Sequence, residues 1–244
     1  MLTLHRARGV RREPGGPLDA GHAVVVDGAR LAAIGPYEEL AAEYGARARV
    51  REWDGVLTPG RHEPDGAALL EASYHPDPRE ADELGSEPLT GEALAGIDMT
   101  EIRWGASARR GLQRLLAAGT TSLTGPFSRP AVRTAVRRSG LDELPAPGPG
   151  LGSGSGSGSG SEPGSGQGPG QGPGAGPGPE AEPGPGARAL TVGGTATFAV
   201  FADDGSALVT VLAGRLVHRR RNPSSDSLDS LASPDSSDSS PHGK

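Results

Sequence analysis

The sequence predicts a mixed α and β protein, in which both ends of the chain build one small composite β-sandwich beside a mostly helical middle. Short apolar runs separated by turn residues fill residues 1–64 and 189–221. Apolar residues at helical spacing dominate residues 65–144. The segments 145–188 and 222–244 have compositions that cannot form a core.

Composition and charge exclude several classes of protein. Only 34% of the 244 residues are hydrophobic and 3% aromatic, so the core must come from Val, Leu, Ile and Ala. A net charge of -6 argues against a nucleic-acid partner, because phosphate binding needs a basic face. Cysteine is absent, and no leader or membrane-length apolar stretch is present, so we expect a soluble cytoplasmic protein with no membrane partner.

The first end of the chain predicts a β-hairpin and a helix. In HAVVVDGARLAAIG two apolar runs flank Asp27 and Gly28, a residue pair typical of type I′ turns. In PYEELAAEYG, Pro36 suits a helix start and Gly45 a helix end. The following ARVREWDGVLTPG predicts one further strand that stops before Pro59.

The second end repeats this β pattern. TATFAVFADD and ALVTVLAGRLVHRR are broken by the turn pairs Asp204-Gly205 and Gly214-Arg215, which predicts two more hairpins. Isolated hairpins are marginal in water, so we expect the two ends to pair and to form one sandwich of about seven or eight strands.

The middle of the chain alternates between helical and extended patterns. DGAALLEASY, EPLTGEALAG and MTEIRWGASARRGLQRLLAAG read as helices, and the last has Thr100 as its cap and Gly119 at its end. The apolar residues at near-helical spacing in that helix are Ile102, Ala106, Leu112, Leu115 and Leu116. A TTSLT strand and a helix in RPAVRTAVRRSGL follow, which is the order of one βα repeat.

Two segments are predicted to be disordered. Residues 145–188 consist of Gly-Ser repeats followed by Gly-Pro-Gln-Glu repeats, and we interpret them as a linker. Residues 222–244 are Ser, Asp and Pro with few apolar residues, and we interpret them as an acidic tail.

Four stretches carry a resemblance to a known family: VVVDGARLAAIGP, WDGVLTPG, LLAAGTTSLT and FAVFADD followed by LVTVLAGRLVHRR. In this order they resemble the metal-dependent amidohydrolases, especially the imidazolonepropionase-like and aminodeoxyfutalosine deaminase-like branch. That resemblance implies a composite β-sandwich beside a (β/α)8 barrel. It also implies hydrolysis of non-peptide carbon-nitrogen bonds by water bound to zinc or iron.

The metal ligands that the resemblance implies are missing from this sequence. The family's His-x-His pair lies five and seven residues after the glycine of the Pro-Gly turn, which here gives Asp65 and Ala67. No histidine occurs between His75 and His218, and RHEPDG is not the apolar strand that the barrel needs. Residues 65–144 give about 80 residues where a complete barrel needs about 200 or more, so we expect only a helical remnant of the barrel.

One group of side chains remains a candidate for a weak metal site. Imidazoles and carboxylates gather at His62, Glu63, Asp65, His75 and Asp77. The alternative is a solvated loop punctuated by proline, and the spacing of the two histidines favours that alternative because it matches no rigid element. The longer stretch SYHPDPREADELGSEPLTG suits either a packing or partner contact or an exposed loop.

The remaining residues of interest have structural interpretations. We expect Trp53 and Trp104 to anchor the core, and Ser107 and Ser122 to lack the His and Asp partners of a catalytic triad. We therefore assign no catalytic, cofactor-binding or metal residue, and expect no cofactor.

Three functional hypotheses follow. The leading one is a non-catalytic binding or regulatory relative of the amidohydrolases. The alternative is a working metal-dependent hydrolase or deaminase with an atypical site or with a barrel completed by another chain. The third is a protein partner or self-association through the sandwich face that the missing barrel would leave uncovered.

Overall fold

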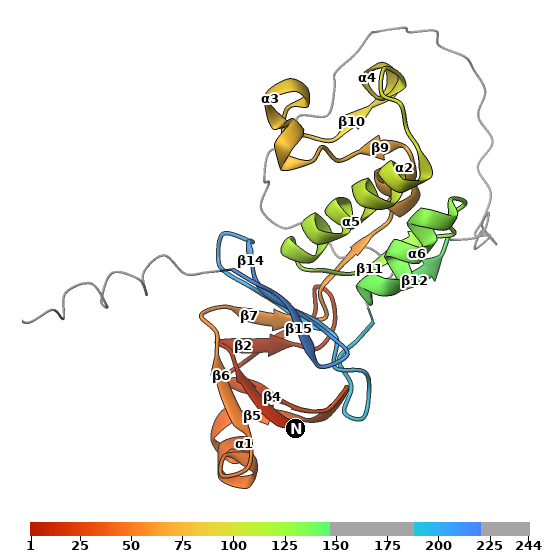
Figure 1. Cartoon of the computed structure of the whole chain (residues 1–244). Helices are drawn as coiled ribbons and strands as arrows, with labels where there is room; N and C mark the ends of the chain where they lie inside the picture. The colour runs from red at the N-terminus through yellow and green to blue at the C-terminus, as the bar shows by residue number, and fades with distance from the viewer. Residues whose placement is uncertain (147–187, 221–244) are drawn as a thin grey trace, which may run out of the picture.

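The computed structural model describes residues 1–146 and 188–220, which form a β-sandwich and an α/β part stacked on it (Figure 1). Most of the predicted linker and the whole predicted tail lie outside the described residues. In the part of the chain that is described, no helix has the length and apolar character needed to cross a membrane.

The first sheet of the sandwich has four strands in the order β5-β4-β1-β6. Its strands are β1 (Leu2–Arg6), β4 (His22–Asp27), β5 (Arg30–Pro36) and β6 (Arg49–Glu52). Strand β4 is antiparallel to β1 and β5, whereas β6 runs parallel to β1. Helix α1 (Tyr37–Tyr44) covers the outer face of this sheet, where Leu40 packs with Leu4 and Val25.

The second sheet has six strands in the order β15-β14-β13-β7-β2-β3 and draws on both ends of the chain. Its strands are β2 (Gly9–Arg11), β3 (Leu18–Ala20), β7 (Val56–Thr58), β13 (Phe198–Phe201), β14 (Ala207–Leu212) and β15 (Arg215–Arg219). The ends join where β7 pairs antiparallel with β13, with Leu57 opposite Val200. This confirms the predicted composite sandwich, although with ten strands rather than seven or eight.

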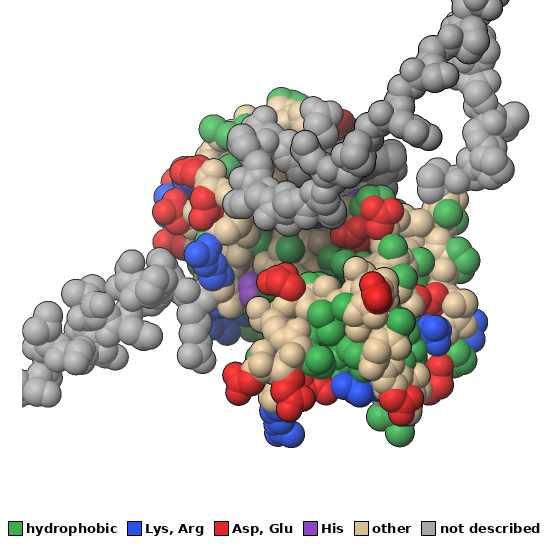
Figure 2. Space-filling view, turned by 90° about the horizontal axis from the view of Figure 1, so that it is seen from above, with side chains coloured by type: hydrophobic (Ala, Val, Ile, Leu, Met, Phe, Trp, Pro, Cys, Tyr) green, Lys and Arg blue, Asp and Glu red, His purple; other side chains and the backbone are tan. Residues whose placement is uncertain are grey.

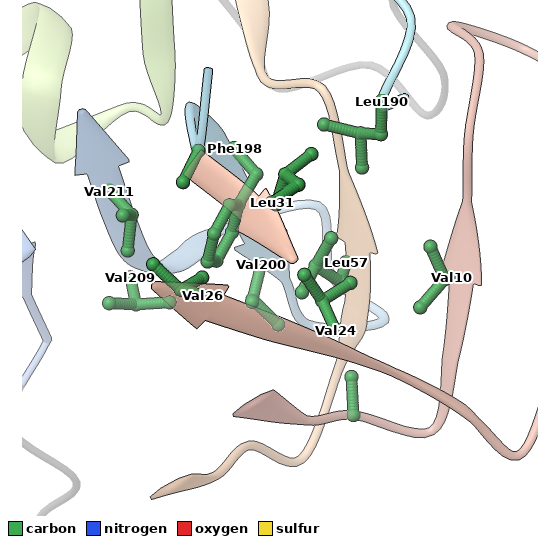
Figure 3. Close-up of a cluster of buried hydrophobic side chains, with 12 residues drawn as sticks. Val10, Val24, Val26, Leu31, Leu57, Leu190, Phe198, Val200, Val209 and Val211 are labelled. Carbon is green, nitrogen blue, oxygen red and sulfur yellow. The ribbon is translucent and has the colours of Figure 1, made fainter. Parts of the chain in front are cut away.

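The core of the sandwich is aliphatic, as the composition requires. Figure 3 shows side chains from both sheets and both chain ends meeting in one buried cluster. The labelled members are Val10, Val24, Val26, Leu31, Leu57, Leu190, Phe198, Val200, Val209 and Val211. Because residues from the two ends fill the same core, neither end buries its apolar face without the other.

Two hairpin turns lie one residue away from their predicted positions. The β4–β5 loop consists of Gly28 and Ala29, because Asp27 already pairs with Arg30. Gly28 has a φ of 57°, as glycine does at the first loop position of a type II′ turn, so the predicted Asp27-Gly28 type I′ turn was wrong. The β14–β15 loop is likewise Ala213-Gly214, and both residues have positive φ.

The single strand predicted before Pro59 is divided between the two sheets. Strand β6 ends at Glu52 and belongs to the four-stranded sheet, and β7 begins at Val56 in the six-stranded sheet. The chain crosses at Gly55, where a Cβ atom would lie 2.4 Å from the Phe201 carbonyl oxygen. The tight approach of two backbones at this glycine therefore makes the crossing, which apolar periodicity does not reveal.

The α/β part is built on three parallel strands in the order β12-β11-β8. Its strands and main helices are β8 (Arg61–Glu63), α2 (Gly66–Glu71), α5 (Glu101–Ala117), β11 (Thr120–Gly125), α6 (Pro130–Ser139) and β12 (Asp142–Pro145). Within this sheet the strands are arranged in their chain order, as in a (β/α)8 barrel, whereas β9 and β10 form a separate two-stranded sheet. The stretch RHEPDG is not an apolar strand, as expected, but its first three residues form the polar strand β8, which pairs with β11.

Helix α5 follows its predicted bounds closely but not its predicted face. The Thr100 side chain accepts a hydrogen bond from the Arg103 backbone N–H, and Gly119 follows the helix end with a φ of 83°. Leu112 and Leu115 are buried as expected, whereas Ile102 is 85% exposed. Ile102 lies in the first turn of the helix, before Trp104, which is the first buried residue of α5.

The stretch SYHPDPREADELGSEPLTG is packed against α5 rather than forming a free loop. It contains β9 (Ser73–Tyr74), η1 (Pro78–Glu80), α3 (Ala81–Leu84) and β10 (Leu89–Thr90), and α4 (Gly91–Ala95) follows it. The buried Tyr74 donates to Glu80 Oε2, at 2.5 Å, and Arg103 of α5 pairs with Glu80 Oε1 at 2.8 Å. The packing interpretation of this stretch is therefore the one that fits.

The α/β part covers the sandwich through α5 and β11. Thr210 of β14 donates to the Leu116 carbonyl oxygen at 2.7 Å, and Leu212 of β14 belongs to the helical core. Phe201 lies so close to Gly119 that a Cβ atom there would be 2.5 Å from its ring. The sandwich face predicted to be uncovered is thus occupied here by the chain's own helix.

Candidate functional site

His62 is held on the sheet face opposite the helices. Leu123 of β11 packs into the helical core, so its neighbours Ser122 and Thr124 point to the other face. His62 Nδ1 lies 2.9 Å from Ser122 Oγ, and His62 Nε2 lies 3.0 Å from Thr124 Oγ1. Both ring nitrogens therefore already have hydroxyl partners within the sheet.

Ser122 has a histidine partner that sequence reasoning missed. The β8–β11–β12 register places His62, Ser122 and Asp142 in one row across the sheet. A catalytic triad needs the imidazole between the hydroxyl and the carboxylate, whereas here the hydroxyl stands in the middle. The three residues therefore do not have the order of a triad.

The positions of the family's first histidine pair lie at the start of helix α2 rather than in a strand. Strand β8 ends at Glu63, Asp65 is the residue before α2, and Ala67 is an exposed residue in its first turn. A His-x-His pair works because alternate residues of a strand point to the same face. Residues 65 and 67 lose that relation because the strand ends at Glu63 and the helix begins at Gly66.

His75 is buried on the other side of α2, against α5. Its side chain is 2% exposed, its Nε2 lies 3.1 Å from the Leu69 carbonyl oxygen, and its backbone N–H donates to Ser107 Oγ at 2.9 Å. Burial lowers the pKa of His75, and the charges of Arg114 and Arg110 lower it further. The imidazole is therefore neutral at pH 7, and the prediction of a solvated loop was wrong at this residue.

The remaining carboxylates of the candidate cluster have local structural roles. Glu63 Oε1 accepts a hydrogen bond from the Asp65 backbone N–H at 3.0 Å. Asp77 caps η1 and pairs with Arg110 at 3.3 Å. Within residues 1–146 and 188–220, no three His, Asp or Glu side chains come close enough to hold a metal ion together.

The two tryptophans are structural, as predicted. Trp104 is 4% exposed and lies under the Arg129 guanidinium, 4.2 Å from its ring centroid. Trp53 packs against the sandwich core and donates its Nε1–H to His5 Nδ1 at 3.2 Å. His5 is itself buried between Trp53 and Phe198, and burial lowers its pKa to about 4.

A cavity of about 250 Å³ lies where the parallel sheet meets the returning segment 188–197. Its lining residues are Arg30, Pro59, Thr121, Ser122, Asp142, Leu144, Arg188, Ala189, Leu190, Thr191, Gly194, Thr195 and Thr197. They come from five separate stretches of sequence, and no motif links them. Only the pairing of the two chain ends brings them together, so sequence reasoning had no signal for this cavity.

Figure 2 shows how charged side chains are distributed on one face of the molecule. Arg side chains are scattered on that face among Asp and Glu side chains and do not form a continuous basic patch there. The expectation of no nucleic-acid partner, which was drawn from the net charge, remains a prediction.

Comparisons with known proteins find similarity to solved structures only. No protein-family model and no curated protein matches the sequence. Solved structures that match 59% of this chain include ochratoxinase from A. niger (18% identity, 31% of its chain, TM-score 0.40). They also include aminofutalosine deaminase from Helicobacter pylori (14% identity, 33% of its chain, TM-score 0.34). A third is guanine deaminase from E. coli (14% identity, 36% of its chain, TM-score 0.36).

These neighbours are deaminases and hydrolases of the amidohydrolase superfamily, the class that the sequence resembles. The chain spans about a third of the length of each of them.

Proposed function

We propose that this chain is a non-catalytic, amidohydrolase-like protein that acts by binding. One observation carries the proposal: the chain enters helix α2 at the point where the family's strand would present its metal ligands. Asp65 precedes the helix and Ala67 lies within it, so neither position offers an imidazole on a strand face. The barrel chemistry of this family depends on a metal-bound water, and such a water needs those ligands.

The residues present do not fit zinc or iron in the way the family binds them. His62 has a hydroxyl within hydrogen-bond distance of each ring nitrogen. His75 lies in a separate buried place between α2 and α5. A catalytic site needs about three protein ligands around one ion, and these side chains do not converge. We therefore derive no reaction step through a metal.

Metal content tests this proposal. The purified full chain, equilibrated with zinc and then dialysed, is expected to hold well under one ion per chain. His62→Gln, which keeps a hydrogen-bonding side chain, and Asp65→Asn are expected to leave that content unchanged. Mass spectrometry of metals in the native chain gives the measurement. Stoichiometric zinc or iron that is lost in His62→Ala combined with His75→Ala would overturn the proposal.

The binding partner in this proposal is a protein, either another chain or a second copy. Strands β8 and β12 each pair with β11 alone among the described residues, so each has one edge without a described neighbour. Open edges of a sheet present unpaired N–H and C=O groups and favour strand addition. Light scattering on the same sample is expected to show a dimer or a complex with a co-purified protein. A strict monomer with no partner would count against this part.

The alternative function is a hydrolase whose barrel is completed by another chain. It is favoured by the order of β8, β11 and β12, which is the order of consecutive barrel strands. A partner that supplied the remaining strands would also have to supply the metal ligands. Stoichiometric metal found only in the complex would therefore favour this alternative.

We also propose a cytoplasmic location. The sequence has no cysteine, so nothing in it depends on an oxidising compartment. Fractionation of the native cells, with the protein found outside the cytoplasmic fraction, would contradict this location.

A further inference from the structure

We propose that the cavity between the parallel sheet and segment 188–197 binds a small zwitterion that carries a carboxylate, an ammonium group and a short aliphatic side chain. The inference goes beyond a protein-binding role, since it concerns a small molecule. The measurement of metal content does not report on this cavity. A failure of the proposed function and a failure of this proposal can therefore be told apart.

The size of the cavity limits the ligand. Its volume of about 250 Å³ is below the range of roughly 300 Å³ and more that drug-sized ligands occupy. A molecule of about the size of a single amino acid fits this space. The floor is made of buried groups, namely Pro59, Thr121, Ser122 and Leu190, of which two are apolar and two carry hydroxyls.

The floor is preorganised by hydrogen bonds within the protein. Thr121 Oγ1 donates to the Pro59 carbonyl oxygen at 3.0 Å, and Ser122 Oγ is fixed by His62 at 2.9 Å. Hydroxyls whose positions are already set lose little entropy when a ligand binds. Leu144 and Leu190 provide the apolar contacts for a short aliphatic group.

The charged groups at the cavity have both signs. Arg30 and Arg188 are exposed and Asp142 is half-buried, and all three line the same cavity. Arg30 Nη1 is held by the Gly193 carbonyl oxygen at 2.8 Å, which fixes one guanidinium beside the opening. Within the described residues, none of the three forms an ion pair with another side chain.

This arrangement of charges selects the class of ligand. Guanidinium groups favour a carboxylate, and a carboxylate favours an ammonium group. A ligand with only one of these charges leaves either Asp142 or the arginines without a partner. A zwitterion satisfies both and brings no net charge into the cavity.

Titration of the isotope-labelled full chain with L-valine, followed by NMR chemical shifts, tests the site. 3-Methylbutanoate lacks the ammonium group of valine, and 2-methylpropylamine lacks its carboxylate. We expect saturable shifts of cavity residues with L-valine and binding at least about tenfold weaker for either single-charge probe, as expected for loss of one charge-assisted hydrogen bond. No saturable shift with L-valine, or equal binding of the three probes, would overturn the proposal.

Two pairs of variants supply matched controls for the cavity. Asp142→Asn removes the proposed ammonium partner, whereas Glu143→Gln changes the next residue of β12, which does not line the cavity. Similarly, Arg188→Gln is compared with Arg215→Gln on β15. Asp142→Asn and Arg188→Gln are expected to weaken L-valine binding about tenfold. If the two control variants weaken it equally, the effect is not local and the assignment is wrong.

Discussion

At the residue scale, His5 couples the stability of the sandwich to pH. Its side chain is 3% exposed, accepts a hydrogen bond from Trp53 and contacts the edge of the Phe198 ring. Burial lowers its pKa from 6.5 to about 4, and the charge of Arg51 adds to this. No feature of LTLHR distinguishes this histidine in the sequence, because its partners lie far along the chain.

The sign of the pH effect follows from where the proton binds. Between pH 6.5 and 4 the unfolded chain binds a proton at His5 and the folded chain does not, so stability falls as pH falls through this window. Between pH 7 and 5 the loss amounts to about 2 kcal/mol from His5 alone. Urea unfolding at these two pH values, followed by tryptophan fluorescence, measures it.

His5→Gln is the control for this effect. Glutamine keeps an acceptor for the Trp53 N–H but does not titrate, so the variant is expected to lose about 2 kcal/mol less between pH 7 and 5. Its pH dependence does not vanish, because burial also lowers the pKa values of His75 and His218. An unchanged pH dependence in His5→Gln would contradict the assignment to His5.

At the scale of elements, the sequence predicted the helix ends and the existence of the hairpins but not their registers. Thr100 and Pro36 mark helix starts through local chemistry that needs no tertiary contact. The turn at Gly28-Ala29 differs from the predicted one because glycine serves at either loop position, and the cross-strand pairing decides between them. The candidate site could not be predicted from the sequence, because His62, Ser122 and Asp142 meet only through the register of the sheet.

Gly119 fixes how closely α5 and β11 approach the sandwich. Its φ is 83°, and a Cβ atom there would lie 2.5 Å from the Phe201 ring. Gly140, which follows α6, also has a left-handed backbone, with a φ of 81°. A Cβ atom added there would lie 3.7 Å from Leu212, so it would fit. The two glycines therefore share a left-handed backbone, and they differ in the space available for a Cβ atom.

Gly119→Ala is expected to destabilise the protein more than Gly140→Ala. Each substitution costs about 1 kcal/mol for the left-handed backbone, and Gly119→Ala costs about 1 to 3 kcal/mol more because Phe201 must move. The free energy of unfolding in urea is the measurement. Equal losses in the two variants would show that the contact between Gly119 and Phe201 is not tight.

At the scale of the whole molecule, one sandwich is built from two ends of the chain. Strand β13 lies between β14 and β7, and its residues Phe198 and Val200 fill the core beside Val24 and Leu57. The predicted division into residues 1–64 with 189–221 and residues 65–144 remains a prediction. Its central claim is that the ends hold together by their own contacts.

Cleavage of the chain within residues 147–187 tests that claim. With a protease site introduced between residues 160 and 170, the two pieces are expected to elute together after cleavage, because β7 and β13 remain hydrogen-bonded and share a core. After separation in urea, the first piece alone is expected to show no cooperative unfolding. Pieces that part in native buffer would contradict the composite sandwich.

The joining of β7 to β13 also frees the middle of the chain from a fixed length. The cost of closing a loop rises by only about 0.6 kcal/mol for each doubling of its length. A sandwich closed by its two ends therefore tolerates βα repeats inserted between residues 146 and 188 with little effect on its own stability. In this architecture the number of repeats can change, whereas the pairing of β7 with β13 must be kept.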